Sequence, residues 1–318
     1  EKNLTIWYLP MKHLGAHGFM DCKYLDPQLK ALFCFGDQQI FLPHVYRWCR
    51  RRRIPFVAYV GTAHSLDSNF KSKVMNALFA AGTLRIYKKN PVLAKTSAAK
   101  EELRQLGVPH AVIAPVGLDT AVLKKNIPAD EKMRLRKEHG FEADDVILCN
   151  VSRLSWEKRP LELIDLFLQV KGKKKFKLII VGNGPLEEEL NEKIRKNGLE
   201  KEVKIYPNVP YEKMWEIYEM SDYYLNMNKG EIFGMAIMEA VYYKTSVAAI
   251  RALGPSVTLK DMKGHKLCEN DDEMAEWITG PYPSEKDLQE SSEKMAATFT
   301  WDRCADAFLQ ASSEKSSR

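Results

Sequence analysis

The chain has 318 residues, of which 45% are hydrophobic and 28% are charged, with a formal net charge of +6. These values exclude general disorder, and the length favours two domains that each bury a core. Apolar runs stay below the ~18 residues of a membrane span, no signal peptide is visible, and the missing initiator Met leads us to expect residues before Glu1.

The first half of the chain alternates short apolar runs with helical patterns. We predict a helix over residues 97–106, with Ser97 as its N-terminal cap and Gly107 as the residue that ends it. This alternation indicates parallel βαβ units. The predicted strands are residues 4–9, 31–35, 55–60, 84–87 and 112–116, and a further helix is predicted over residues 40–50.

The second half repeats this alternation after a charged, strand-free connection over residues 123–145. From residue 284 the pattern is helical, with Trp301 and Phe308 as expected anchors. Two open sheets facing a cleft would bind ligands beyond the carboxyl ends of their strands. The predicted strands are residues 146–151, 176–181, 203–206, 223–227 and 247–250, and a helix is predicted over residues 131–139. The predicted domains are residues 1–122 and 123–285, followed by a C-terminal segment, residues 286–318, that packs back toward the cleft.

The stretch after residue 227 reads as a glycine turn that leads into a helix. The first amides of a helix that begins near Gly234 lack intrahelical partners, and together with the helix dipole they form an anion site. Glu231 lies just before this helix, and Glu239 lies about two turns into it on roughly the same side. Two carboxylates beside an anion site suit a ligand with hydroxyl groups on both sides of a diphosphate, as in a nucleotide sugar.

Two more loops follow predicted strands in this half of the chain. Arg153 and Lys158 come after the first strand, where fixed cations can stabilise a departing diphosphate. Gly182, Asn183 and Gly184 come after the second, and their glycines let the backbone approach a ligand closely, so we assign this loop to nucleoside packing. Taken alone, the first loop also fits surface charge and the second an ordinary turn.

Together with Asn208-Val209-Pro210, these motifs resemble the retaining GT-B glycosyltransferases of the family-4 type. The similarity covers roughly residues 94–311 and is strongest from 146 to 254. The E-x7-E spacing of Glu231 and Glu239 arises often by chance, whereas the ordered set of loops after successive strands is specific. The resemblance implies an α/β fold of the GT-B class, with two Rossmann-like, doubly wound domains facing a cleft.

The resemblance also implies retaining transfer of a hexosyl unit from a nucleotide sugar, with UDP as the expected nucleotide, to a hydroxyl group of a glycan or lipid-linked acceptor. It implies no metal and no cofactor besides this donor. The implied catalytic residues are Arg153 and Lys158 at the diphosphate, Glu231 at the sugar hydroxyls and His64 at a strand end facing the donor. The implied donor-binding residues are Gly182, Asn183, Gly184, Ile205 and Tyr206 at the nucleoside, Phe233, Gly234 and Met235 at the phosphate or sugar, and Glu239 at the ribose.

The first domain departs from the family pattern. Only 30 residues precede the strand predicted at 31–35, too few for the opening strands and glycine-rich loop of the family. We therefore expect an N-terminal domain that is shortened or truncated. Two alternatives to a transferase stay open: a non-catalytic partner subunit on the same fold, and a sugar-nucleotide epimerase, which would need no acceptor.

Five arginines cluster between Arg47 and Arg53, around Trp48. Such a run is most often solvated surface, and the alternative is contact with anionic lipid head groups, at up to ~1 kcal/mol per charge. No nucleic-acid motif accompanies it, so nucleic-acid binding is not expected. The six cysteines have no paired spacing, which favours reduced thiols in a cytoplasmic protein. With the lipid interpretation of the arginine run, we expect this protein to be peripheral at the inner face of the membrane.

Overall fold

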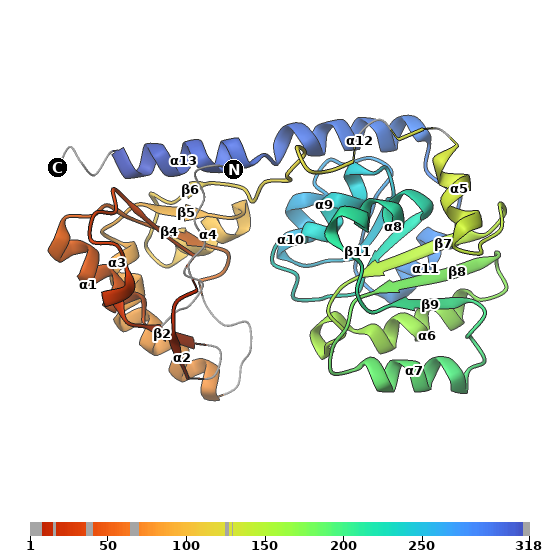
Figure 1. The fold of residues 1–318 in the computed structure, drawn as a ribbon, viewed down its shortest axis with the longest axis horizontal. Coiled ribbons are helices and arrows are strands. Elements are labelled where there is room, and N and C mark those ends of the chain that lie inside the picture. The colour runs from red at the N-terminus through yellow and green to blue at the C-terminus, as the bar shows by residue number, and fades with distance from the viewer. Residues whose placement is uncertain are drawn as a thin grey trace. The chain divides into compact units, whose positions relative to one another are not determined.

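The computed structural model describes residues 8–14, 17–35, 41–63, 70–124, 127–128 and 130–313 (Figure 1). The chain forms two compact units: the first contains Glu1–Val116 and Asp302–Arg318, and the second contains Gly117–Trp301. The first division falls after Val116, whereas the predicted boundary lies after residue 122. The predicted C-terminal segment 286–318 is divided between the two units.

A parallel sheet forms the centre of the first unit, and its strand order is β3-β4-β5-β6. One face of β4 and β5 shares a core with helices α1 to α4. The strands are β3 (Leu32–Phe35), β4 (Phe56–Val60), β5 (Val92–Ala94) and β6 (Val112–Ile113), and the helices are α1 (Leu42–Arg52), α2 (Phe70–Ala81), α3 (Thr83–Tyr87) and α4 (Ser97–Gln105). An antiparallel pair, β1 (Met11–Leu14) and β2 (His17–Met20), and the short helix η1 (Cys22–Tyr24) precede them.

Helix α13 (Trp301–Ser313) covers the second face of this sheet. Its Phe308 ring lies 4.6 Å from the ring of Phe33, between centroids, so the predicted anchoring by Phe308 is confirmed. Trp301 is 42% exposed, so the predicted anchoring by this residue is wrong. The chain therefore returns to its first unit to close the core on the second face of the sheet.

Two local predictions for the first unit are wrong. Residues 84–87, predicted as a strand, lie in helix α3, and strand β5 that follows was not predicted. A four-residue apolar run suits a buried strand and a buried helical turn equally, so packing decides between them. Thr96, not Ser97, caps α4, because its hydroxyl accepts a hydrogen bond from the Ala99 amide at 3.0 Å. The strand predicted over 4–9 lies largely outside the described residues.

The second unit contains a parallel sheet with the order β12-β11-β10-β7-β8-β9. Strand β7 therefore pairs with β8 on one side and with β10 on the other, so the winding of the chain reverses between β7 and β10. In open α/β sheets this reversal is where ligands bind, beyond the carboxyl ends of the strands. The strands are β7 (Val146–Val151), β8 (Phe176–Val181), β9 (Val203–Tyr206), β10 (Tyr223–Asn226), β11 (Ser246–Ile250) and β12 (Lys266–Cys268).

Helices cover both faces of this sheet (Figure 1). Three of them, α6 (Pro160–Val170), α7 (Glu187–Lys196) and α11 (Asp271–Thr279), share one core with alternate strand residues such as Tyr223 and Leu225. The other face contacts α8 (Met214–Met220) and α9 (Met235–Tyr242), which α5 (Glu131–Glu138) and α12 (Glu285–Thr298) cover in turn. The short helices are η2 (Trp156–Lys158), η3 (Tyr211–Lys213) and α10 (Leu253–Thr258). The predicted strands of this half are confirmed, and only β12 was missed.

Candidate functional site

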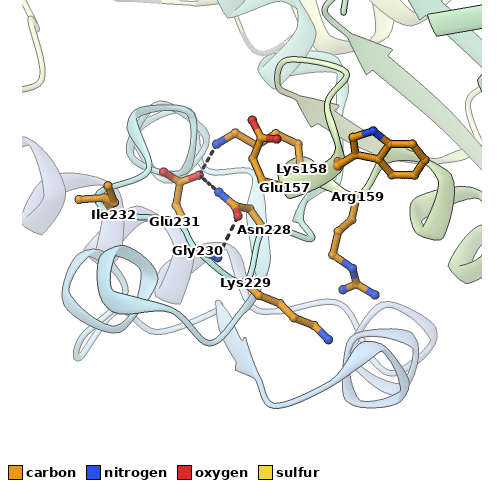
Figure 2. Close-up of a pocket in the computed structure, with 9 residues that line it drawn as sticks. Glu157, Lys158, Arg159, Asn228, Lys229, Gly230, Glu231 and Ile232 are labelled. Atoms are coloured by element: carbon orange, nitrogen blue, oxygen red, sulfur yellow. Dashed lines mark hydrogen bonds and ion pairs between the residues drawn. The ribbon is translucent and has the colours of Figure 1, made fainter. Parts of the chain in front are cut away.

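The loops that follow β7 and β10 bring one lysine and one glutamate together. The Nζ atom of Lys158 lies 2.9 Å from Oε2 of Glu231 (Figure 2). The side-chain amide of Asn228 donates a second hydrogen bond to the same oxygen, at 3.1 Å. Burial by itself raises the pKa of the Glu231 carboxyl, but these two donors and Asn226 outweigh it, so its pKa lies below the usual value. Glu231 is therefore held as a carboxylate.

The Lys158–Glu231 pair lines a pocket of about 450 Å³. The loop after β10 turns around Asn228, whose side-chain nitrogen donates to Glu231 and whose Oδ1 accepts the Gly230 amide at 2.9 Å. Asn228 thereby orients the glutamate, and sequence reasoning missed it, although its place just beyond a buried strand was a usable signal. The lining consists of Trp156, Glu157, Lys158, Arg159, Asn228, Lys229, Gly230, Glu231 and Ile232.

The cations of the first loop differ in their surroundings. Arg153 is exposed and is not part of the pocket lining, whereas Lys158 is. Arg159, which we did not predict, pairs with Asp271 at 2.8 Å and donates to the Met227 carbonyl at 3.4 Å. Arg159 thus ties the loop after β7 to α11 and to the end of β10, and this holds the neighbouring Lys158 in place.

The glycines of the second loop have a packing role. A Cβ atom on Gly182 would lie 1.9 Å from the Ser152 carbonyl oxygen, and one on Gly184 would lie 2.4 Å from that of Leu154. The Asn183 carbonyl accepts the Leu154 amide at 2.9 Å. The loop after β8 therefore presses its backbone against the loop that carries Arg153 and Lys158. The nucleoside contact predicted for it stays a prediction.

Helix α9 begins at the turn that follows Glu231. Gly234 has a φ of 87°, a left-handed conformation that glycine adopts readily, and no side chain caps the helix. Phe233 is buried with its ring 5.9 Å from the ring of Phe299, between centroids. Met235 is exposed, and the Glu231 carbonyl accepts the Gly254 amide at 2.8 Å. The helix start is thus fixed by packing and by Gly254, a residue that sequence reasoning missed.

Glu239 lies in a second, smaller pocket of the same unit, and its surroundings are unlike those of Glu231. It accepts hydrogen bonds from Tyr218 at 2.8 Å and from Tyr211 at 3.3 Å. Burial raises the pKa of its carboxyl, although both tyrosine hydroxyls act in the opposite direction. The E-x7-E motif therefore places one carboxylate beside a lysine and the other among tyrosines.

The remaining predicted residues lie at other places. Ile205 and Tyr206 end β9, and the Tyr206 hydroxyl lies 2.9 Å from Nδ1 of His139. His64 lies outside the described residues. Among the described residues no group of three His, Cys, Asp or Glu side chains could hold a metal ion, and a metal-independent reaction stays a prediction.

Comparisons with known sequences place this unit in a family. The family model described as "Glycosyl transferases group 1" matches residues 131–295, slightly more than half of the chain. The D-inositol 3-phosphate glycosyltransferase of Mycobacterium avium is 26% identical over 297 residues, which cover 82% of this chain and 65% of that protein. The amylovoran biosynthesis glycosyltransferase AmsD of Erwinia amylovora is 34% identical over 112 residues, which cover 35% of this chain and 31% of that protein. The chain thus spans less than two thirds of the length of these relatives.

Comparison of structures identifies the fold. The crystal structure of Anabaena HepE in complex with UDP matches with a TM-score of 0.69 at 19% identity, over 86% of this chain and 76% of that one. With two parallel α/β units of Rossmann type, the fold is that of the GT-B proteins, as predicted. Over the residues that the structure describes, no helix combines the length and the apolar character needed to cross a bilayer.

Proposed function

We propose that this chain, which belongs to the glycosyl transferases group 1 family, moves a hexosyl unit from a nucleotide sugar to a hydroxyl group of a glycan or lipid-linked acceptor. The observation that carries the proposal is the Lys158–Glu231 pair in an open pocket of about 450 Å³ beyond the ends of β7 and β10. A lysine positioned there can stabilise the negative charge of a departing diphosphate, and a carboxylate can accept hydrogen bonds from sugar hydroxyls.

The reaction that we propose retains the configuration at the anomeric carbon. The bond from this carbon to the diphosphate oxygen breaks, and a bond to the acceptor oxygen forms on the same face. The proton of the acceptor hydroxyl passes to the departing phosphate oxygen. Lys158, with Arg153 five positions earlier in the same loop, stabilises that phosphate, so catalysis consists of electrostatic stabilisation and positioning, without a metal.

The donor nucleotide in this proposal is UDP, with its ribose at Glu239, as the family resemblance implies. The UDP bound in Anabaena HepE supports the choice of nucleotide. The similarity to AmsD, named for amylovoran biosynthesis, supports a glycan acceptor. Within this proposal Gly182 to Gly184, Ile205 and Tyr206 pack against the nucleoside, and Phe233 to Met235 lie at the phosphate or sugar.

A donor screen tests the proposed function. The natural full-length protein is incubated with UDP- and GDP-sugars, with and without glycan acceptors, and nucleotide release and the anomeric configuration of the product are measured by NMR. We expect release from a UDP-hexose and an α-linked product from an α-linked donor. Nucleotide binding without release would indicate a non-catalytic subunit, and a changed sugar without an acceptor would indicate an epimerase. An inverted product would contradict the mechanism.

We further propose that helix α1 contacts anionic lipid at the inner face of the membrane. Arg47 and the four residues Arg50–Arg53 are exposed, while Leu42, Val45 and Trp48 bury the opposite face. The Arg52 guanidinium lies 4.7 Å from the centre of the Trp48 ring and so extends along the helix. Flotation with anionic vesicles should exceed flotation with neutral ones, and the difference should shrink when Arg50, Arg51 and Arg53 are replaced by Gln. Equal flotation would end this proposal.

A further inference from the structure

Both oxygens of the Glu239 carboxylate are occupied by tyrosines of its own chain. Glu239 is only 8% exposed. Tyr218 donates to Oε2 at 2.8 Å, and Tyr211 donates to Oε1 at 3.3 Å. Because this carboxylate is nearly buried and each oxygen already has a donor, a ligand hydroxyl that binds here competes with the tyrosine hydroxyls.

The two tyrosines are not equally replaceable. Tyr218 is 1% exposed, and its ring stacks on that of Tyr243 with centroids 5.9 Å apart and planes within 11°. Removing its hydroxyl from Glu239 would disturb the core of the second unit. Tyr211 is 52% exposed, lies at the first residue of the three-residue helix η3, and makes the longer bond. Tyr211 is thus the less tightly packed of the two tyrosines, so Oε1 is the oxygen that is released more readily.

The surroundings of Tyr211 suit an exchange of hydroxyl groups. Tyr211 and Glu239 line one small pocket with Trp215, Tyr243 and the connecting residues 122–124. Burial, followed by the Glu239 charge, raises the pKa of Tyr211 to about 12, so its hydroxyl stays protonated and acts as a donor at neutral pH. A ligand that takes its place must therefore present a hydroxyl donor, because a buried carboxylate oxygen left without one is costly.

We propose that Tyr211 is a displaceable cap on Glu239 that competes with a hydroxyl group of the ligand and so sets the affinity for the nucleotide. The ligand in question is the ribose of the donor, so this inference rests on the proposed function. In the free chain the cap holds Oε1. In the complex a ribose hydroxyl replaces it, and one hydrogen bond to the carboxylate is exchanged for another with little net gain.

Removing the cap should therefore strengthen the binding of ribonucleotides alone. In Tyr211→Phe the ribose hydroxyl meets an unpaired oxygen, and we expect UDP to bind about three- to tenfold more tightly than to the unmodified protein. A nucleotide that lacks both ribose hydroxyls, 2′,3′-dideoxy-UDP, should bind both proteins equally. The ratio of the two affinities is the decisive quantity, since a purely structural role of Tyr211 would not change it.

Isothermal titration calorimetry on the natural full-length protein measures these affinities. The matched control is Tyr282→Phe, because Tyr282 is comparably exposed and its hydroxyl donates to the Asp222 carbonyl at 3.2 Å, away from both pockets. We expect this control to bind both nucleotides as the unmodified protein does. Thermal melting shows that the variants are folded, and Tyr211→Leu, with the same expected direction, replaces Tyr211→Phe if the latter fails to fold.

Three results would overturn the inference in distinguishable ways. If the unmodified protein binds neither UDP nor GDP, the proposed function fails and the cap falls with it. If it binds UDP but Tyr211→Phe shows an unchanged or weaker affinity, only the cap is refuted. If UDP and 2′,3′-dideoxy-UDP gain equally, Tyr211 acts by blocking the pocket and not by competing for Glu239, and the inference is again refuted.

Discussion

Two ion pairs stand at opposite ends of the central strands of the second unit. At the amino end, Arg136 lies 2.7 Å from Asp222, which precedes β10. At the carboxyl end, Lys158 lies 2.9 Å from Glu231, which follows β10. The two pairs are alike in distance and in charge, but the first borders a pocket of about 260 Å³, whereas the second borders a larger one of about 450 Å³.

The difference lies in how completely the polar atoms are satisfied. Arg136 is 4% exposed and also donates to the carbonyls of Met220 and Asp145. Asp222 additionally accepts the Ile147 amide and the Lys132 ammonium. Both charges therefore have several partners within the fold, and we interpret this pair as a connection between its elements. Among the described residues, Lys158 pairs with the carboxylate of Glu231 and also borders the pocket. A charged group with few partners at the end of a strand is typical of a functional site, whereas a fully hydrogen-bonded ion pair is typical of a structural role.

The largest effect on stability should come from the amino-end pair. Arg136→Met removes the hydrogen bonds to three carbonyls, those of Met220, Ala143 and Asp145, and leaves Asp222 with one cation, which should lower the free energy of unfolding by about 3–5 kcal/mol. Urea denaturation measures this loss. Transfer activity per folded molecule should be unchanged. A variant that is stably folded but has lost activity would contradict the purely structural role of the Arg136–Asp222 pair.

The largest effect on activity should come from Lys158→Ala. Loss of the cation should lower the transfer rate about 100- to 1000-fold, because charge on the departing diphosphate is no longer stabilised. The melting temperature should change little, since a partly exposed ion pair contributes only about 1 kcal/mol. Lys201→Ala, at an exposed lysine before β9, is the control. Unchanged turnover in Lys158→Ala would refute the role of this lysine.

A pH effect on stability should again arise at the amino end of the sheet. The Nδ1 atom of His265 accepts the Val247 amide at 3.0 Å, and its Nε2 finds no partner among the described residues. Burial lowers the pKa of His265 from 6.5 to about 4. The unfolded chain binds the proton more readily, so stability falls as the pH drops from about 6.5 toward 4, by at most about 3 kcal/mol.

The urea midpoints of the unmodified protein and of His265→Asn, each measured at pH 7.5 and at pH 4.5, test this prediction. The asparagine oxygen can still accept the Val247 amide but does not titrate. The variant should therefore show a smaller drop in stability over this range. Identical pH dependence in the two proteins would mean that other groups cause the acid sensitivity.

A smaller effect should follow from Glu231→Gln. The amide keeps the shape of the side chain but loses the charge that pairs with Lys158, so turnover should fall about tenfold, which corresponds to ~1.4 kcal/mol. UDP affinity, measured by calorimetry, should stay within about twofold, because in the proposed function the nucleotide lies at Glu239 and not at Glu231. Equal losses of turnover and affinity would show that Glu231 contacts the nucleotide and not the sugar.

Much of this site could be predicted from the sequence because the signals are local. The buried-type strands from Val146 to Ile250 and the loops that follow them are contiguous in the chain, and their alternation with helices is enough to place Lys158 and Glu231 at one edge of a sheet. The partners of these residues were harder to predict. Asn228 had a local signal, its place just beyond a buried strand, whereas Arg159 and Gly254 act through contacts that depend on how the loops pack, and no spacing in the sequence encodes those distances.

The sequence by itself determined the succession of strands and helices in the second unit and the identity of the charged residues beyond them, because hydrophobic period and turn residues act over a few positions. Tertiary structure alone decided that residues 84–87 are helical and that α13 closes the first sheet. It also decided that two glutamates eight positions apart have opposite pKa shifts. A carboxylate takes its properties from the groups that surround it, and for Glu231 and Glu239 those groups are a lysine and two tyrosines brought in from distant parts of the chain.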